Sequence, residues 1–305
     1  MTTTPPTFLQ AIERFRLHLE TTKHPPRTVR DYTDDLILWN RWLTDNSFVE
    51  QVAQLSRDDV TEYLSYLARE HTGRASNDGQ KGVAASTLKR KLAALRKFAA
   101  FLVEEGYHIA NVTQNIKGPR VPRKEPVFFN QQEYKAILFE AQRRDKPRDY
   151  AILMTFIQTG IREGELCNLR LSDLDLTRHE LTVRGRKGGV DTDIPLNSQA
   201  MDALNRWLEK RPEATTDHLF LSKTSKPLTD RSVRYLVKSY IRRAGIKKLA
   251  SVHTLRHTFG SHKANMGVDI AQLQYWMGHK RKETTLTYIH LIKKRAPELM
   301  EQTAL

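Results

Sequence analysis

The sequence has a single cysteine and no long apolar run, and each absence excludes a class of protein. Cys167 alone, in a chain of 305 residues, excludes an internal disulfide and a zinc site built from several cysteines. No apolar stretch approaches the length of a membrane span, and Met1 to Pro6 are polar and proline-rich, unlike a secretion signal. We therefore expect a cytoplasmic protein without a membrane partner.

Acidic residues are absent between Asp230 and Asp269, where nine basic residues stand unopposed. The whole chain has 50 Lys and Arg against 35 Asp and Glu, a formal net charge of +15. Residues 1–120 hold 17 basic and 14 acidic residues, whereas residues 121–305 hold 33 and 21. A field of this sign favours a polyanion, and we expect nucleic acid to bind mainly to the second part of the chain.

Two domains are predicted from the chain length and from a proline-rich segment near its middle. Residues 117–126 contain three prolines, one glycine and four basic residues, which is typical of a linker. We expect a DNA-binding domain over residues 1–116, a linker over 117–126 and a second domain over 127–305.

The first domain is predicted to be all helical. Capping signals and apolar periodicity place four helices at about 8–21, 28–44, 56–70 and 86–105, with Thr28 and Ser56 as caps of the second and third. The apolar stripe of the fourth helix should face the core, which leaves its basic residues mostly on outer faces. There they could meet a phosphate backbone, although a merely soluble helix would have the same pattern. These residues are Lys89, Arg90, Lys91, Arg96 and Lys97.

The second domain is predicted to be mainly helical with a small β-sheet. Helices are expected at about 130–144 and 148–159, and a β-hairpin is formed by residues 180–184 and 191–196 around a glycine turn. The remainder is expected to be helical again. Arg242 and Arg243 are further candidates for contact with DNA.

A glycine turn at Thr159-Gly160-Ile161-Arg162 is the first of four clusters with chemical potential. It ends one helix and places Arg162 at the start of the next, where the guanidinium could fork onto two phosphate oxygens. Glu165 shares the helical face and could hold a neighbouring cation. A surface ion pair would explain the same residues.

The hairpin tip and a histidine-rich helix form the second and third clusters. Lys187, beside two glycines, could swing toward a bound backbone, although a lysine at such a tip is usually only solvated. His253 and Arg256 lie three residues apart and project on one face, which pairs a proton carrier with a phosphate clamp. His253 and His257 have a spacing seen in zinc sites, but no second cysteine or close acid completes a tetrahedron.

Gly278-His279 and Tyr288 form the fourth cluster. A tyrosine near the end of a chain ordinarily serves packing. As a nucleophile, a phenol with a reference pKa of about 10 would need cations and a base nearby.

Together these clusters resemble the tyrosine recombinases, or phage-integrase family, and within it the bacterial Xer-like members. The first arginine motif of the family matches Thr159 to Leu166, its His-x-x-Arg motif matches His253 to Arg256, and Gly278-His279 is followed nine residues later by Tyr288. The resemblance covers the whole chain. It implies an all-α, SAM-like four-helix domain followed by an α+β catalytic domain whose C-terminal tail docks on a neighbouring protomer.

The resemblance also implies a mechanism. The Tyr288 oxygen attacks a phosphate to give a 3′-phosphotyrosine, while Arg162 and Arg256 neutralise charge, and a Holliday junction forms within a homo- or hetero-tetramer on paired sites of double-stranded DNA. His253 transfers protons, His279 donates to the phosphate and Glu165 supports the site. Lys187 would protonate the leaving oxygen. No metal or other cofactor is expected, and nucleoid association in the cytoplasm is implied.

One departure from the family and two rival functions remain. Relatives have Gly-Lys-Gly in the hairpin, whereas this chain has one residue more, so Arg186 competes with Lys187 for the lysine position. We favour Lys187 because an arginine does not release its proton. The rivals are a type IB topoisomerase, which relaxes supercoils without pairing two sites, and a regulator that binds DNA without catalysis. The target site and the biological task stay open.

Overall fold

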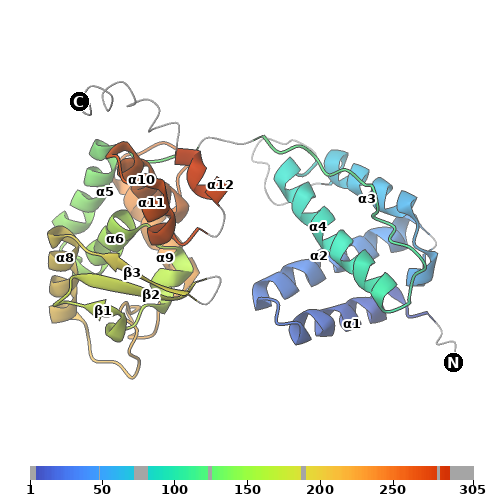
Figure 1. Ribbon diagram of the computed structural model, residues 1–305, viewed down its shortest axis with the longest axis horizontal. Coiled ribbons are helices and arrows are strands. Elements are labelled where there is room, and N and C mark those ends of the chain that lie inside the picture. The colour runs from blue at the N-terminus through green and yellow to red at the C-terminus, as the bar shows by residue number, and fades with distance from the viewer. Residues whose placement is uncertain are drawn as a thin grey trace. The chain divides into compact units, whose positions relative to one another are not determined.

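The computed structural model describes residues 5–47, 49–71, 82–122, 126–186, 190–279 and 282–288. The chain divides into two compact units, Met1–Arg123 and Lys124–Leu305. The elements of both are labelled in Figure 1. Within the described ranges, none of the helices has the length and apolar content that a membrane crossing requires.

The described part of the first unit is built from four α-helices, as the sequence predicts. They are α1 (Phe8–Thr21), α2 (Pro26–Asn46), α3 (Arg57–Arg69) and α4 (Ala85–Glu104), with the 3₁₀ turn η1 (Val52–Gln54) before α3. Ser56 caps α3 in a capping box with Asp59, as expected. The predicted cap at Thr28 is wrong: α2 begins at Pro26, because proline is already set for the first turn of a helix.

Lys91 is the exception to the prediction that the basic residues of α4 lie mostly on outer faces. Its side chain is buried, and its ammonium lies 2.8 Å from a carboxylate oxygen of the buried Asp35 of α2. Arg90 pairs with the same carboxylate. The apolar stripe of α4 therefore includes one lysine, because Asp35 offers a countercharge inside the helix packing. Lys89, Arg90, Arg96 and Lys97 are exposed, and Arg96 also donates to the carbonyl of Ile116.

The second unit is mostly helical and carries one small sheet, as predicted. Asn130 caps the first of its helices in a capping box with Glu133, at the predicted place. The helices are α5 (Gln131–Arg143), α6 (Pro147–Thr159), α7 (Glu163–Asn168), α8 (Ser198–Lys210), α9 (Asp230–Arg243), α10 (Val252–Asn265), α11 (Ile270–Met277) and α12 (Lys282–Thr285), with the 3₁₀ turns η2 (Leu171–Asp173) and η3 (Leu286–Tyr288).

The sheet has the order β1-β2-β3 and is antiparallel throughout. Its strands are β1 (Leu174–Asp175), β2 (Glu180–Arg186) and β3 (Val190–Pro195). Leu181, Val183 and Ile194 point their side chains into the main core, which fixes the register because a slip of one residue would expose them. The register shifts between Val183 and Arg186, so the end of β2 departs from regular pairing.

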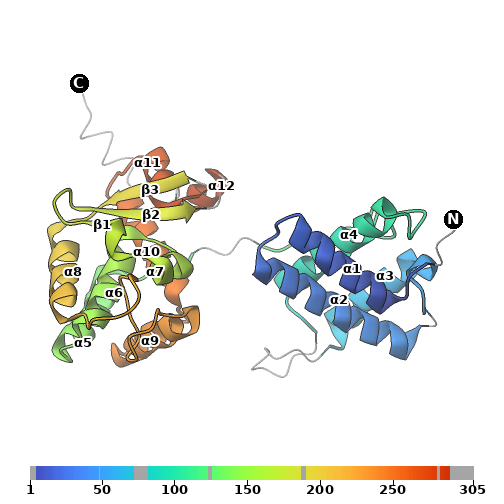
Figure 2. The same cartoon turned by 90° about the horizontal axis from the view of Figure 1, so that it is seen from below.

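Helix α6 lies at the centre of this unit and contacts α5, α8 and α10. Six of its residues are buried hydrophobic side chains or alanine, including Phe156 and Ile157. In Figure 2 the sheet and α9 lie on opposite sides of α6 and α7. The C-terminal end of α6 packs on α10, where Gly160 lies against Phe259, and the turn that follows it carries Arg162.

Candidate active site

The turn between α6 and α7 places Arg162. Gly160 adopts a left-handed conformation with φ of 62°, and a Cβ there would lie 2.4 Å from Cδ1 of Phe259 in α10, so only glycine fits. Arg162 then occupies the N-cap position of α7, as expected from the sequence. Its side chain is 38% exposed, which leaves the guanidinium accessible to a ligand.

Arg256 lies in α10 and is almost fully buried. It donates to the carbonyl of Gly160 at 2.6 Å and to the carbonyl of Met277. Burial and the nearby Arg162 lower the pKa of Arg256 to about 9, so it is still cationic at neutral pH. The two predicted arginines therefore come from α7 and α10 and meet at the same turn.

The C-terminus of α11 gathers three guanidinium groups. Arg256 donates to Met277, Arg162 donates to the carbonyl of Gly278 at 2.8 Å, and Arg186 donates to the carbonyls of Trp276 at 2.6 Å and Tyr275 at 3.3 Å. The last carbonyls of a helix have no partner within the helix and lie at the negative end of its dipole. The backbone carbonyls of residues 275–278, at the C-terminus of α11, thus partly neutralise the charges of three arginines.

Glu165 completes this cluster as its acid. One carboxylate oxygen accepts from the Arg162 side chain at 2.7 Å, and the other accepts from the Arg162 backbone at 2.7 Å and from Arg186 at 3.3 Å. Burial opposes ionisation of Glu165, but Arg186 and Arg162 outweigh it and lower its pKa. Glu165 is therefore an anion that binds both the backbone N–H and the side chain of Arg162.

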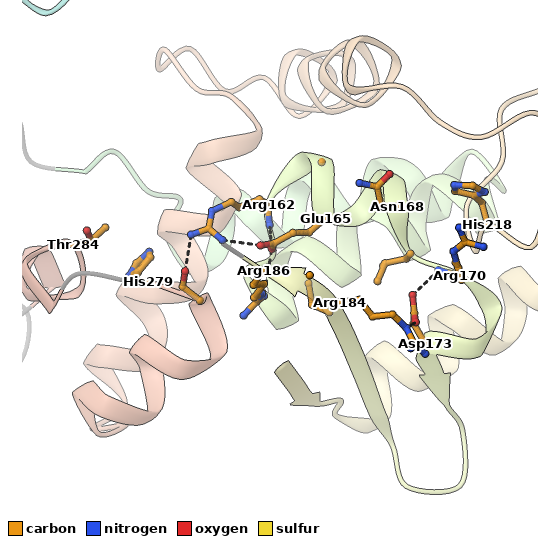
Figure 3. Close-up of a pocket in the computed structure, with 15 residues that line it drawn as sticks. Arg162, Glu165, Asn168, Arg170, Asp173, Arg184, Arg186, His218, His279 and Thr284 are labelled. Carbon is orange, nitrogen blue, oxygen red and sulfur yellow. Dashed lines mark hydrogen bonds and ion pairs between the residues drawn. The ribbon is translucent and has the colours of Figure 1, made fainter. Parts of the chain in front are cut away.

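A groove of about 940 Å³ runs from this cluster across α7 and β2. Figure 3 shows Arg162, Arg186 and His279 toward one end, and Arg170, Arg184 and His218 toward the other. Four arginines and two histidines line it against two acidic residues, which suits an extended phosphodiester backbone more than a small apolar ligand.

His279 lies in the turn that follows α11. Gly278 caps that helix with φ of 59°, as expected, and the Nδ1 atom of His279 lies 2.9 Å from the Thr285 hydroxyl. Burial and the adjacent Arg256 and Arg162 lower the pKa of His279 to about 3, so its ring is neutral. A neutral ring still has one N–H to donate, which suits a hydrogen bond to a phosphate oxygen.

His253 and His257 stand one turn apart on α10, with ring centroids 6.5 Å apart. The side chain of His253 reaches the surface, and the partial burial of its ring together with Arg256 lowers its pKa. Burial together with His253 lowers the pKa of His257. In the described part of the chain, no group of three His, Cys, Asp or Glu side chains is placed to hold a metal ion.

Tyr288 is buried, with 1% of its surface exposed. Its hydroxyl lies 2.9 Å from Nδ1 of His257, and its ring packs on Gly260, where a Cβ would lie 2.5 Å from Cζ of the tyrosine. Burial raises the pKa of Tyr288 to about 12, against the effect of Arg256. The hydroxyl does not line the groove that Arg162 and His279 line. In this arrangement the phenol is protonated and shielded.

Other predicted residues fall outside this cluster. Lys187 and the tail over residues 289–305 lie outside the described residues, so the choice of Lys187 over Arg186 stays a prediction. Arg242 and Arg243 are exposed on α9. The sequence did not indicate that His257 contacts Tyr288, because the two residues lie 31 positions apart. It also did not indicate the hydrogen bonds of the arginines to α11, because every residue has a backbone carbonyl and residue type does not show which carbonyls accept.

Comparisons with known proteins identify the family of the chain. The phage integrase family model matches residues 127–295, and the model of the phage integrase N-terminal SAM-like domain matches residues 12–106. The tyrosine recombinase XerC of Staphylococcus carnosus (strain TM300) is 31% identical over 290 residues, which cover 93% of this chain and 90% of that protein. The tyrosine recombinase XerA of Pyrococcus furiosus is 29% identical over 299 residues, 97% of this chain and 94% of that one.

Solved structures show the same fold. XerH site-specific recombinase bound to its palindromic difH substrate, in a post-cleavage complex, superimposes with a TM-score of 0.76 over 99% of this chain and 98% of that one, at 20% identity. A lambda integrase tetramer bound to a Holliday junction gives 0.72 over 93% and 78%, at 17% identity. The family matches cover both units, and the chain belongs to the phage integrase family, the tyrosine-type site-specific recombinases.

Proposed function

We propose that the protein cuts and rejoins DNA through a covalent bond between Tyr288 and a 3′ phosphate. One observation carries the proposal: Arg162, Arg256 and His279, which are far apart in the sequence, meet at the C-terminus of α11 beside a basic groove. Two cations and a neutral N–H donor around one position suit the charge that develops on a phosphate under attack.

The proposed reaction is a transesterification. The Tyr288 oxygen attacks the phosphorus atom, the bond to the 5′ oxygen breaks, and the freed 5′ hydroxyl later attacks the phosphotyrosine of the partner duplex. Arg162 and Arg256 bind the non-bridging oxygens, and each such contact is worth about 3 kcal/mol in the transition state. His253 takes the phenolic proton, and Lys187 donates a proton to the leaving oxygen. Each strand transfer conserves the number of phosphodiester bonds, so no ATP is required.

Tyr288 must leave its buried place before it can attack. Its hydroxyl is bonded to His257 and its ring rests on Gly260, while the phosphate would lie among the groove residues. The tyrosine belongs to a small cluster with Phe259, Leu273 and Met277. We propose that DNA binding releases the short segment η3 from this cluster, so that the nucleophile stays shielded in the uncomplexed protein and is presented only on DNA.

We further propose that the protein works as a homo- or hetero-tetramer on paired sites through a Holliday junction. Two structural neighbours, XerH recombinase and lambda integrase, were solved as DNA complexes, the second as a tetramer on a Holliday junction. Residues 1–116 would bind DNA through Lys89 and Lys97, residues 117–126 would link the domains, and residues 127–305 would hold the active site and an exchanged tail. Association with the nucleoid in the cytoplasm follows from this activity.

The test is a covalent adduct on a nicked substrate from which the cut fragment diffuses away. Wild-type protein should yield a DNA-linked peptide that contains Tyr288, identified by mass spectrometry. Tyr288→Phe keeps the packing of the ring, so DNA affinity should stay within about twofold while the adduct vanishes. Tyr275→Phe, on an exposed ring whose backbone carbonyl is retained, is the matched control. An adduct on another tyrosine would remove the proposed site.

A type IB topoisomerase activity is distinguished by the product. Tetrameric recombination on two sites yields exchanged strands, whereas a topoisomerase relaxes supercoils on DNA with a single site at the same rate. Relaxation that is independent of a second site would replace the proposed function.

A further inference from the structure

We propose that Arg186 is a positioning residue, which holds Glu165, and through it Arg162, against the C-terminus of α11. This inference rests on the proposed function. Arg186 is the last residue of β2, and in the sequence it competes with Lys187 for the position of the family's lysine. Its surroundings give it a different task.

Arg186 is held inside the protein. Only 4% of its side chain is exposed, against 38% for Arg162. A buried guanidinium needs partners, because an unpaired buried charge is very unfavourable. Arg186 has them in the carbonyls of Trp276 and Tyr275 and in the carboxylate of Glu165. Both terminal nitrogens are thereby occupied, and within the described residues the buried Nε has no partner. The guanidinium of Arg186 therefore points toward the C-terminus of α11 and Glu165, which build the site.

Glu165 transmits this contact to Arg162. The carboxylate oxygen that accepts from Arg186 also accepts from the backbone N–H of Arg162, and the other oxygen binds the Arg162 side chain. Without Arg186, the carboxylate loses a charged partner on one side and can turn toward the Arg162 side chain. Arg162 would then bind its own glutamate with both nitrogens and donate less to a phosphate.

Gly278 shows how closely Arg186 is fitted to α11. A Cβ on Gly278 would lie 2.7 Å from Cδ and 2.9 Å from Nη1 of Arg186, which no real contact of this kind allows. The same glycine gives its carbonyl to Arg162 at 2.8 Å. Arg186 therefore packs on the residue whose carbonyl orients Arg162, so the two arginines are coupled through Gly278 as well as through Glu165.

The test compares Arg186→Met, which keeps the length of the side chain, with Arg186→Lys, which keeps the charge but loses the planar guanidinium with its two terminal nitrogens. Single-turnover cleavage at saturating DNA should be about 100-fold slower in Arg186→Met, the loss expected for a misplacement of about 1 Å, and less slow in Arg186→Lys. DNA affinity should change by less than about twofold, because the weakened contact of Arg162 is one of several phosphate contacts and the others remain.

A substrate with a methylphosphonate at the scissile position separates positioning from general damage. This group lacks the negative charge that Arg162 neutralises, so the defect of Arg186→Met should shrink to a few-fold on it, as the defect of Arg162→Ala should. A defect that stays the same on both substrates overturns the inference. Full rescue of Arg186→Met by a 5′-bridging sulfur, with none by methylphosphonate, would assign Arg186 to the leaving group and overturn it too.

A double variant tests the route through Glu165. If Arg186 acts through this carboxylate, Arg186→Met combined with Glu165→Gln should cleave no more than about twofold slower than the slower single variant. Multiplication of the two defects contradicts the route. Wild-type protein that forms no Tyr288 adduct would refute the proposed function, whereas an adduct together with wild-type rates in Arg186→Met would refute only this inference.

Discussion

Gly260→Ala should expel Tyr288 from its buried place. The added methyl group would lie 2.5 Å from Cζ, 2.8 Å from Cε2 and 2.9 Å from the hydroxyl oxygen of the tyrosine, so ring and methyl cannot both stay. Overpacking of a core costs about 1–3 kcal/mol, which corresponds to a roughly 5- to 140-fold shift toward the released tyrosine. The backbone of α10 is helical here, so alanine itself is favoured over glycine by about 0.5–1 kcal/mol.

Spectroscopic titration reports the release directly. Burial raises the pKa of Tyr288 to about 12, and release should return it toward the reference value of about 10. The neutral phenol stabilises the folded state below pH 10, and this contribution disappears as the pH rises from 10 to 12. In Gly260→Ala the alkaline titration should therefore contain one more ordinary tyrosine, and single-turnover cleavage of a nicked substrate should become faster.

The matched control places Gly260→Ala in a Tyr288→Ala background, where the methyl group meets no ring. There the substitution should stabilise the protein by about 0.5–1 kcal/mol through helix propensity. If Gly260→Ala destabilises both backgrounds equally and leaves the tyrosine titration unchanged, Tyr288 does not rest on Gly260 as described, and the release step fails with it.

Further predictions concern four other features. Lys187→Ala should lose cleavage on ordinary DNA and regain it on DNA with a 5′-bridging sulfur, whose thiolate leaves without a proton; no rescue would remove Lys187 as the acid. Cleavage by the wild type should survive excess chelator, and restoration of a lost activity by magnesium or zinc would overturn the metal-free mechanism. In the unfolded chain His279 is protonated below about pH 6.5, whereas in the folded protein its ring stays neutral down to about pH 3. The free energy of unfolding should therefore fall as the pH is lowered from 6.5 to 3, and His279→Gln should reduce this fall in urea titrations. Lys91→Met should destabilise the first unit by about 3 kcal/mol in urea denaturation, because Asp35 loses a buried partner; an unchanged midpoint would show that Arg90 alone is sufficient.

Local signals predicted helix ends well wherever a side chain satisfies the first turn. Ser56 with Asp59 and Asn130 with Glu133 are capping boxes in the structure. The signal at Thr28 failed because Pro26 starts the helix two residues earlier. All of these helix starts depend on contacts between residues that are close in sequence. The error at Thr28 arose because Pro26 and Thr28 are competing start signals for the same helix.

Contacts between distant residues were less predictable. The motifs identified Arg162, Arg256, His279 and Tyr288 as candidates, but not that the tyrosine hydroxyl meets His257, 31 residues away. The burial of Lys91 is not predicted by the helical pattern of α4, because that pattern contains no information on Asp35 of α2. A periodic pattern shows which face of a helix is apolar, whereas the partner of a buried charge depends on the packing of another element.

The eight-residue helix α11 has a consequence for how the site could be tuned from a distance. Its C-terminal carbonyls orient three arginines in the folded protein, so part of the ordering entropy is lost on folding rather than on DNA binding. The opposite end of the helix is capped by Asp269, which accepts from the backbone of Ala271 at 2.8 Å and of Gln272 at 3.2 Å. If α11 frayed from its N-terminus, the three guanidinium groups would lose their orientation together. The exposed carboxylate of Asp269 could therefore set how strongly the site binds a phosphate.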